Sequence, residues 1–482
     1  MNRQIRTAVF ILLAGIAAEV STPAWAQRAT SLAQAKTLYV ENFRGTADAP
    51  ALREKLVNRI EKEHRFRIVN ARDAADAILE GTGQIWMRGY VSTNARTPAN
   101  NRTPVYAGYL SLEVTGAAGQ PLWSWLATPG KLQWKSIVDD LADRAANRLI
   151  DAAREYNATA TTGPSAGKLV QTELTGGGAT FPAPLYRKWF EDFEELHAGV
   201  KIHYSLLGSK AGVEKLVDGS LDFAGSDVAP EIADTAAAGK MKRVASVMGA
   251  VVAIYNLPGE VRDLHFTPQA LADIYLGKVK MWNDPEIRRS NPGLNFPDAA
   301  IAVVHRSEGS GTTWVWSSYL SKVSPEWSTA VGHGLELKWP VGTGAEGNDG
   351  VADMVSKTPN SIGYVEMAYA IQRQLSFAGV RNRAGQYIHA DLDTLAEAAR
   401  SVGADTQVPA DISDAPGKNA YPIAAFTWLV IPAEANDPAR KAALAELLRW
   451  VLTSGQKECS ALGYEPLPRE IAERQLRDLG NQ

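Results

Sequence analysis

One local pattern occurs three times in this chain of 482 residues and constrains its fold more than any other feature. In each copy an apolar stretch runs into a turn rich in Gly, Ser and Thr, and the turn runs into a helix-like stretch. The copies lie at residues 170–193, 200–212 and 300–320. A strand that enters a helix through such a turn directs backbone N–H groups and the positive end of the helix dipole to one point. The repetition therefore predicts an open α/β sheet whose strands end around a site for a small tetrahedral anion.

The third copy carries the side chains best suited to an anion. Its strand is predicted over residues 300–304, and its helix opens over residues 314–320. Between them, Ser310 and Thr312 offer hydroxyl donors. Arg306 offers a planar guanidinium that can hold two oxygens of one phosphate or carboxylate. The alternative interpretation of this stretch taken alone is an ordinary turn with a surface arginine.

The other two copies add donors and one acid. Thr180 lies in the turn before a helix predicted over residues 185–193, and Ser209 opens a helix after a strand over residues 200–205. A further apolar stretch, residues 221–227, ends in Asp227. Taken singly, each residue fits a tight turn equally well. Together they predict three helix starts, one arginine and one aspartate around a single anion.

The first 26 residues have the features of a secretory signal peptide. Arg3 and Arg6 precede a short apolar core at residues 7–18, and residues 24–26 form a small-x-small cleavage site. The apolar core is shorter than the ~20 residues that a membrane-spanning helix needs. We therefore expect a cleaved signal, a mature chain that begins at Gln27, and export to the periplasm.

Composition excludes several classes of function. Cys459 is the single cysteine, so neither an intramolecular disulfide nor a cysteine-based metal cluster can form. The formal net charge of −3 gives no general attraction to nucleic acid. The histidines show no metal-binding spacing such as H-E-x-x-H, and the G-x-S-x-G motif of serine hydrolases is absent. We expect no metal and no cofactor.

The region before the repeated pattern is expected to form a small domain of its own. Residues 28–157 predict a mixed α/β unit without a catalytic constellation, and residues 158–172 form a linker rich in Thr, Gly and Pro. Strands are predicted over residues 37–40, 66–69 and 77–86, helices over 51–63 and 136–156, and a hairpin over 106–114 and 121–127. The role of this domain is left open.

Motifs in the last two-thirds of the chain resemble one family. They are LTGGGATFPAPLY at residues 174–186, DFAGSD at 222–227, RSEGSGT at 306–312, LGKVKMW at 276–282, SKVSPEW at 321–327 and SIGYVEMAY at 361–369. In type, order and spacing they resemble the periplasmic phosphate-binding proteins of high-affinity phosphate ABC importers. The resemblance covers about residues 174–468.

The resemblance implies a two-lobed, type II-like periplasmic binding protein with a hinge of crossing strands, within residues 173–482. The first lobe would comprise residues 174–252 and 421–482, and the second residues 254–419. It also implies that phosphate lies dehydrated in the cleft. The implied contacts are Thr180, Phe181, Ser209, Asp227, Arg306, Ser310, Gly311 and Thr312.

Two acids carry separate expectations within that family. An ionised Asp227 accepts hydrogen bonds only, so it would accept one from protonated phosphate and would repel sulfate, which has no proton at neutral pH. At position 308 the family commonly has aspartate, which steadies the arginine. This chain has Glu308, which is one methylene longer, so the geometry of Arg306 is an open question.

A second motif points elsewhere. Residues 342–347 fit the G-x-G-x-x-G pattern of dinucleotide-binding turns, with Glu366 about twenty residues later. The preceding Lys338, Trp339 and Pro340 form a poor strand, so we interpret this loop as structure of the second lobe.

We therefore expect an exported, non-enzymatic protein that captures inorganic phosphate and delivers it to a membrane permease of an ABC importer. Two alternatives stay open. One is an envelope phosphatase that uses the same cleft. The other is a phosphate-sensing scaffold in which residues 28–157 bind a partner in the envelope.

Overall fold

The computed structural model describes residues 29, 31–91, 103–116, 119–129, 134–155, 171–228, 240–258, 263–403, 411–434 and 437–480. The predicted signal peptide and most of the predicted linker lie outside these residues. Within them, the helices are each too short or too polar to cross a membrane.

An N-terminal unit is built on one sheet, with strand order β3-β1-β4-β5-β6 and with β2 paired to β4. Its elements are β1 (Thr37–Val40), β2 (Arg44–Gly45), α1 (Ala49–Lys62), β3 (Arg67–Val69), β4 (Ala77–Val91), β5 (Thr103–Gly116), β6 (Pro121–Ala127) and α2 (Trp134–Glu155). Leu52, Leu56 and Ile60 repeat along one face of α1 and are fully buried. Helices α1 and α2 pack on each other and on one face of the sheet.

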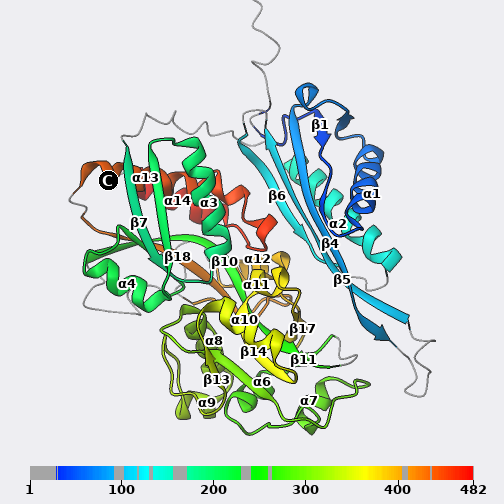
Figure 1. The fold of residues 1–482 in the computed structure, drawn as a ribbon, viewed down its shortest axis with the longest axis vertical. Coiled ribbons are helices and arrows are strands. Elements are labelled where there is room, and N and C mark those ends of the chain that lie inside the picture. Colours follow the sequence, from blue (N-terminus) through cyan, green and yellow to red (C-terminus); the bar gives the residue numbers. More distant parts are fainter. Residues whose placement is uncertain are drawn as a thin grey trace, which may run out of the picture.

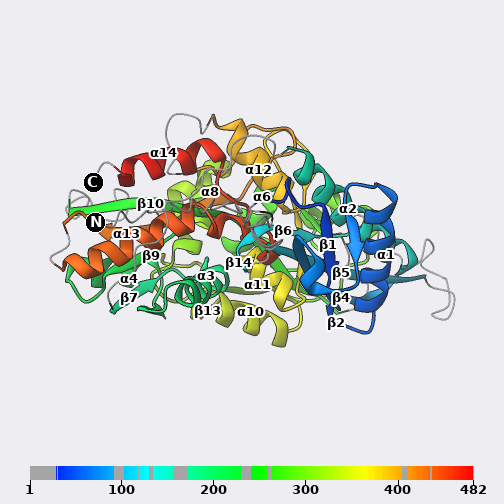
Figure 2. The ribbon, with the colours of Figure 1, turned by 90° about the horizontal axis from the view of Figure 1, so that it is seen from above.

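The other face of this sheet is covered as well. β6 is buried along most of its length, because α2 packs on one side of it and residues 455–462 pack on the other. In Figures 1 and 2 the blue elements of this unit stand at one side of the molecule, beside the green and red elements.

The rest of the chain shares a longer sheet, with strand order β13-β12-β14-β10-β18-β9-β7-β8. Its first part contains β7 (Thr172–Gly178), α3 (Ala183–Leu196), β8 (Val200–Leu206), α4 (Ser209–Val217) and β9 (Phe223–Ser226). The end of the chain returns to this part with β18 (Ala424–Pro432), α13 (Pro438–Leu452) and α14 (Arg469–Gly480), and short 3-10 turns at Gly455–Lys457 and Ser460–Leu462.

A second part lies below the first in Figure 1. Its helices are α6 (Pro268–Tyr275), α7 (Pro285–Ser290), α8 (Gly311–Val323), α9 (Pro325–Ala330), α10 (Gly347–Lys357), α11 (Met367–Gln372) and α12 (Leu392–Ser401). Its strands are β11 (His265–Phe266), β12 (Ala302–Arg306), β13 (Thr343–Ala345), β14 (Ser361–Glu366), β15 (Ser376–Phe377), β16 (Gly379–Arg381) and β17 (Tyr387–Ile388). β11, β16 and β17 form a small separate sheet.

The strand β10 (Met241–Asn256) joins these two parts. Its first half pairs with β18, and its second half, from Val251, pairs with β14. Its residues from Val244 to Tyr255 are buried, which fits a continuous apolar run covered on both faces. The chain is therefore an α/β protein with two lobes that share crossing strands, as expected.

Two local predictions need correction. Residues 176–178 were expected in a turn after β7, but they belong to the strand itself. A Cβ at Gly176 would lie 2.2 Å from the Phe223 ring, and one at Gly178 would lie 2.3 Å from the carbonyl oxygen of Gly225. These glycines therefore allow β7 to approach β9 closely.

The helix α8 begins at Gly311 rather than at Trp314. The earlier start follows from Ser310, whose Oγ accepts a hydrogen bond from the backbone N–H of Thr313 at 3.1 Å. That is the contact of an N-cap residue, and it extends the helix into the predicted anion turn.

Candidate functional site

The three turn-helix units meet where the two lobes face each other. The backbone N–H of Lys210, in α4, donates to the carbonyl oxygen of Gly309, just before α8, at 3.2 Å. A Cβ on Gly311 would lie 2.4 Å from Ser209 Oγ and 2.5 Å from Asp227 Oδ2. Only glycine fits there, because the start of α8 lies directly against residues of the other lobe.

Asp227 lies at the end of β9 and is buried. Its Oδ1 accepts a hydrogen bond from Thr427 Oγ1 at 2.9 Å, and its Oδ2 lies 3.4 Å from Ser209 Oγ. Burial raises the pKa of Asp227 to about 7, against the opposing effects of Thr427, the Arg306 charge and Ser209. Near neutral pH this carboxyl can therefore either hold a proton or accept one in a hydrogen bond.

Arg306 closes β12, and its side chain is almost fully buried. Its Nε donates to Glu308 Oε1 at 2.9 Å, its Nη2 pairs with the same oxygen, and its Nη1 donates to Thr312 Oγ1 at 3.2 Å. Its backbone N–H donates to the hydroxyl of Tyr364 at 3.2 Å. The guanidinium is thus held on one side by Glu308 and directed on the other toward the start of α8.

Glu308 takes the family's aspartate position and still reaches the arginine. Its Oε1 also accepts from the backbone N–H of Gly347 at 3.0 Å, while its buried Oε2 has no hydrogen-bond partner among the described residues. Burial raises the pKa of Glu308, but the hydrogen bond and charge of Arg306 outweigh it, so the pKa falls below its usual value. The longer side chain therefore uses one oxygen both for the arginine and for the first backbone N–H of α10.

Thr180 and Phe181 form the turn before α3, and two tyrosines hold this turn. The hydroxyl of Tyr369, in α11, donates to the carbonyl oxygen of Thr180 at 2.5 Å. The hydroxyl of Tyr464 donates to the carbonyl oxygen of Phe181 at 2.7 Å. The turn is therefore anchored from the other lobe and from the C-terminal segment.

Asn348, which no sequence motif assigned to the site, connects the two lobes. Its Nδ2 donates to Thr180 Oγ1 at 2.8 Å and to Thr312 Oγ1 at 3.2 Å, and its Oδ1 accepts from the backbone N–H of Glu366 at 2.9 Å. The residue is fully buried at the start of α10. The sequence feature that could have identified Asn348 is its position directly after the glycine-rich loop at residues 342–347, which was interpreted as structure of the second lobe.

That loop does not have the geometry of a dinucleotide-binding turn. Gly344 lies inside the strand β13, whereas the motif requires its glycines in the turn between strand and helix. Thr427 and the two tyrosines were not predicted as site residues either. Tyr369 ends the motif at residues 361–369 but was assigned no role, and nothing near Thr427 or Tyr464 in the chain distinguishes them from ordinary core residues.

All the predicted site residues lie in one region at the junction of the lobes. Thr180, Thr312 and Arg306 are linked through Asn348, and Asp227, Ser209 and Gly311 contact one another. Ser310 caps α8 beside them, and Phe181 follows Thr180. Chemically, the region offers hydroxyl donors, three helix starts, one cation and one acid that titrates near neutrality, which suits a small oxyanion that can carry a proton.

Comparison with known proteins places this region in a family. The PBP superfamily domain matches residues 158–454. The phosphate-binding protein PstS of Xylella fastidiosa strain Temecula1 is 39% identical over 323 residues, which cover 66% of this chain and 88% of that protein. The PstS protein of Methanocaldococcus jannaschii is 37% identical over 323 residues, covering 61% of this chain and 82% of that protein.

A solved structure shares the fold. It is a high-affinity periplasmic phosphate-binding protein bound with phosphate, 22% identical, with a TM-score of 0.51 over 63% of this chain and 93% of that one. The N-terminal unit lies outside the residues that the PBP superfamily domain matches. The chain belongs to the PBP superfamily and, within it, to the family of the phosphate-binding protein PstS.

Proposed function

We propose that this protein captures inorganic phosphate between its two lobes and delivers it to the membrane permease of an ABC importer. One observation carries the proposal: the buried Arg306 and the buried Asp227 flank the start of α8, where Gly311 contacts the opposite lobe. A cation and a protonatable acid on either side of a helix start fit an anion that has both charge and a proton to donate. The relatives named as phosphate-binding proteins support the same ligand.

The contacts proposed for phosphate are hydroxyls, backbone N–H groups and two charged side chains. They are Thr180, Phe181, Ser209, Asp227, Arg306, Ser310, Gly311 and Thr312, with Glu308 as the support of the arginine. Among these residues Arg306 is the only cation. It therefore supplies most of the charge attraction, and the other donors determine shape.

The same geometry favours binding over catalysis. Ser310 Oγ accepts the N-cap hydrogen bond, and Nδ1 of the neighbouring His305 is hydrogen-bonded to the carbonyl oxygen of Arg306 at 2.9 Å while its ring stacks on Trp339. Neither contact aims the histidine at the serine as a general base. Delivery to a permease and a periplasmic location follow from family membership together with the predicted signal peptide, which lies outside the described residues.

An envelope partner for the N-terminal unit remains a prediction. The sheet face that carries Ser111 and Ser124 contacts this chain's own residue Ala461, so such a partner would need another surface.

The test is calorimetric titration of phosphate, and of sulfate as a control, into protein that has been unfolded, dialysed and refolded to remove bound anion. At pH 8.5, where Asp227 is ionised, we expect one tight phosphate site, no signal with sulfate, and no release of phosphate from a chromogenic ester. Arg306→Ala should lose most of the affinity, while Lys201→Ala, which removes an exposed lysine paired with Glu194, should not change it. Absence of phosphate binding to the refolded protein would refute the proposal.

A further inference from the structure

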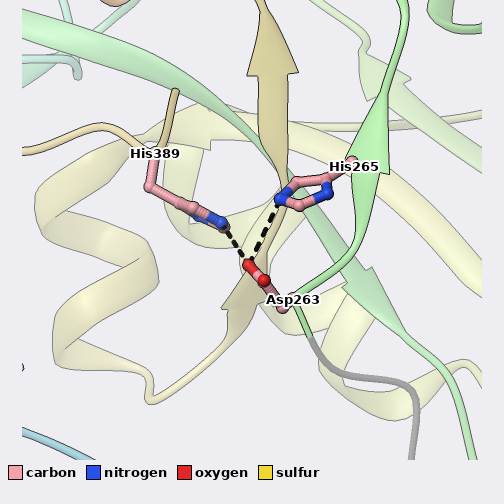
Figure 3. A group of neighbouring side chains, drawn as sticks. All are labelled: Asp263, His265 and His389. Carbon is pink, nitrogen blue, oxygen red and sulfur yellow. Dashed lines mark hydrogen bonds and ion pairs between the residues drawn. The ribbon is translucent and has the colours of Figure 1, made fainter. Parts of the chain in front are cut away.

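Three side chains that the phosphate site does not use converge on the small sheet of the second lobe (Figure 3). Asp263 Oδ1 lies 2.7 Å from Nε2 of His389 and 3.3 Å from Nε2 of His265. The possible ligand atoms of the three residues all lie within 4.8 Å of one another. Asp263 precedes β11, His265 begins it, and His389 follows β17, so two segments far apart in the chain supply the cluster.

The sheet leaves room for this cluster at one position. β16 lies between β11 and β17, and Gly379 of β16 pairs with His265. A Cβ on Gly379 would lie 2.8 Å from Cδ2 of His265 and 3.0 Å from Nε2 of His389. The absent side chain is therefore what allows the two imidazoles to lie over the same strand.

Neighbouring side chains hold both rings in place. The buried Asn291 pairs with the backbone of His265 twice: its Oδ1 accepts from the N–H and its Nδ2 donates to the carbonyl oxygen, each at 2.8 Å. The ring of Tyr387 stacks on His265 with centroids 4.7 Å apart, and Phe377 meets the ring of His389 edge-on. These contacts fix the backbone of His265 and restrict the orientation of both rings.

We propose that Asp263, His265 and His389 bind a divalent transition-metal ion, with Zn²⁺ as the occupant. Two imidazole nitrogens and one carboxylate oxygen suit Zn²⁺, whereas Mg²⁺ and Ca²⁺ prefer oxygen ligands alone. Ligands about 2.1 Å from a tetrahedral Zn²⁺ are about 3.4 Å from one another, so the observed separations need only small side-chain rotations. The side chains of Asp263 and His389 are partly exposed, at 61% and 40%, so the fourth position faces solvent.

The site is separate from the proposed phosphate contacts. The small sheet contains none of those contacts, so Zn²⁺ and phosphate should bind independently. Zinc would tie Asp263, before β11, to His389, after β17, and it should stabilise the folded protein increasingly as the free Zn²⁺ concentration rises above the dissociation constant.

The experiment is titration of ZnCl₂ into untagged protein that has been treated with chelator and freed of phosphate, in a buffer without phosphate. We expect one equivalent of Zn²⁺ to bind, MgCl₂ to give no signal, and Co²⁺ to give the visible absorption of a site with nitrogen ligands. His265→Ala and His389→Ala should each weaken Zn²⁺ binding by about 10-fold or more. His203→Ala is the matched control, because His203 forms an exposed pair with Glu173 at 2.8 Å in the other lobe.

Gly379→Ala provides a test that keeps all three ligands. Its methyl group would displace both imidazoles, so we expect zinc affinity to fall about as far as in the histidine variants. Phosphate titration of the same variant should be unchanged, which shows that the second lobe is folded. Wild-type protein without saturable zinc binding, or equal zinc affinity in the wild type and in His265→Ala, would overturn the proposal.

Discussion

Asp227 shows how a single residue can set the choice of anion. It is buried, its Oδ1 is held by Thr427, and its Oδ2 faces Ser209 and the start of α8. A carboxylate in this position needs a partner that brings a proton. Sulfate is a dianion without a proton, so placing it beside the buried carboxylate of Asp227 would cost energy. This cost would exclude sulfate from the site.

We expect Asp227→Asn to bind phosphate more weakly and to accept sulfate. The amide loses a charge-assisted hydrogen bond, worth about 1.5–3 kcal/mol, and gains an N–H that can donate to sulfate. Calorimetric titration with both anions measures the two effects. If the variant kept the wild-type preference for phosphate, Asp227 would not be the discriminating group.

The same residue predicts a pH dependence in the unmodified protein. Because burial raises the pKa of Asp227 to about 7, its carboxyl becomes protonated as the pH falls through neutrality. Sulfate binds only when the carboxyl of Asp227 is protonated. Sulfate binding should therefore be present below about pH 7 and should be lost as the pH rises above about 7.

We therefore expect sulfate to bind measurably at pH 5 and not at pH 8.5, whereas Asp227→Asn should bind it equally at both. Equal sulfate affinity of the wild type at the two pH values would contradict this account.

At the scale of elements, the contacts that connect the two lobes differ in how deeply they are buried. Asn348, at the start of α10, is buried and links Thr180 of one lobe to Thr312 of the other. Lys210 and Glu336 also connect the lobes, at 2.8 Å, but both are exposed. A buried hydrogen bond leaves its partners unsatisfied when it is removed, while an exposed ion pair contributes about 0–1 kcal/mol.

These contacts predict unequal effects on phosphate release. Asn348→Ala should weaken phosphate affinity by about 10-fold or more, mainly through faster dissociation, because the closed arrangement loses its buried connection. Glu336→Gln is the matched control and should change affinity by less than about 3-fold, with an effect that fades at high salt. Stopped-flow dissociation measures both; similar rates for the two variants would argue against a special role for Asn348.

The element boundaries predicted from the sequence differ in how closely they agree with the structure. The helix predicted from apolar spacing over residues 51–63 and the hairpin predicted over residues 106–114 and 121–127 agree closely with α1, β5 and β6. The start of α8 was placed three residues too late, because the capping contact of Ser310 contributes no apolar signal. The glycines of β7 were assigned to a turn because a close approach to another strand cannot be seen in the local sequence.

At the scale of the whole molecule, the N-terminal unit is part of the support of the proposed site. Ser111 Oγ donates to the carbonyl oxygen of Ala461 at 2.8 Å, and Ser124 Oγ accepts from its N–H at 3.2 Å. Three residues later, Tyr464 holds the carbonyl oxygen of Phe181. A chain of contacts therefore leads from the N-terminal sheet to the turn at Thr180 and Phe181 that is proposed to bind phosphate.

Gly463 marks the point where three parts of the molecule meet. It has a φ of 87°, and a Cβ on it would lie 3.4 Å from Leu126 of the N-terminal unit and 3.6 Å from Ile371 of the second lobe. The left-handed conformation favours glycine, and the two distances are those of ordinary van der Waals contact. The N-terminal unit thus packs where both lobes come together.

This packing predicts that removing both serine contacts affects stability and binding. We expect Ser111→Ala/Ser124→Ala to destabilise the protein by about 2 kcal/mol, since each hydrogen bond contributes about 1 kcal/mol, and to weaken phosphate binding a few-fold. The control is Ser356→Ala/Ser401→Ala, which removes two local helix contacts. Thermal unfolding and phosphate titration of the full chain give both readouts; no difference between the double variants would mean that the two units act independently.

The sequence by itself determined the local chemistry of this protein. Strands that enter helices through Gly, Ser and Thr, together with one arginine and one strand-end aspartate, indicated an α/β fold and an anion, because backbone donors and helix dipoles arise from neighbouring residues. Tertiary structure decided what lies far apart in the chain. It placed Asn348 between two threonines and gathered Asp263, His265 and His389 over Gly379. Asn348 and Thr180 are 168 residues apart, and Asp263 and His389 are 126 apart, so only the packing of strands and lobes brings them together.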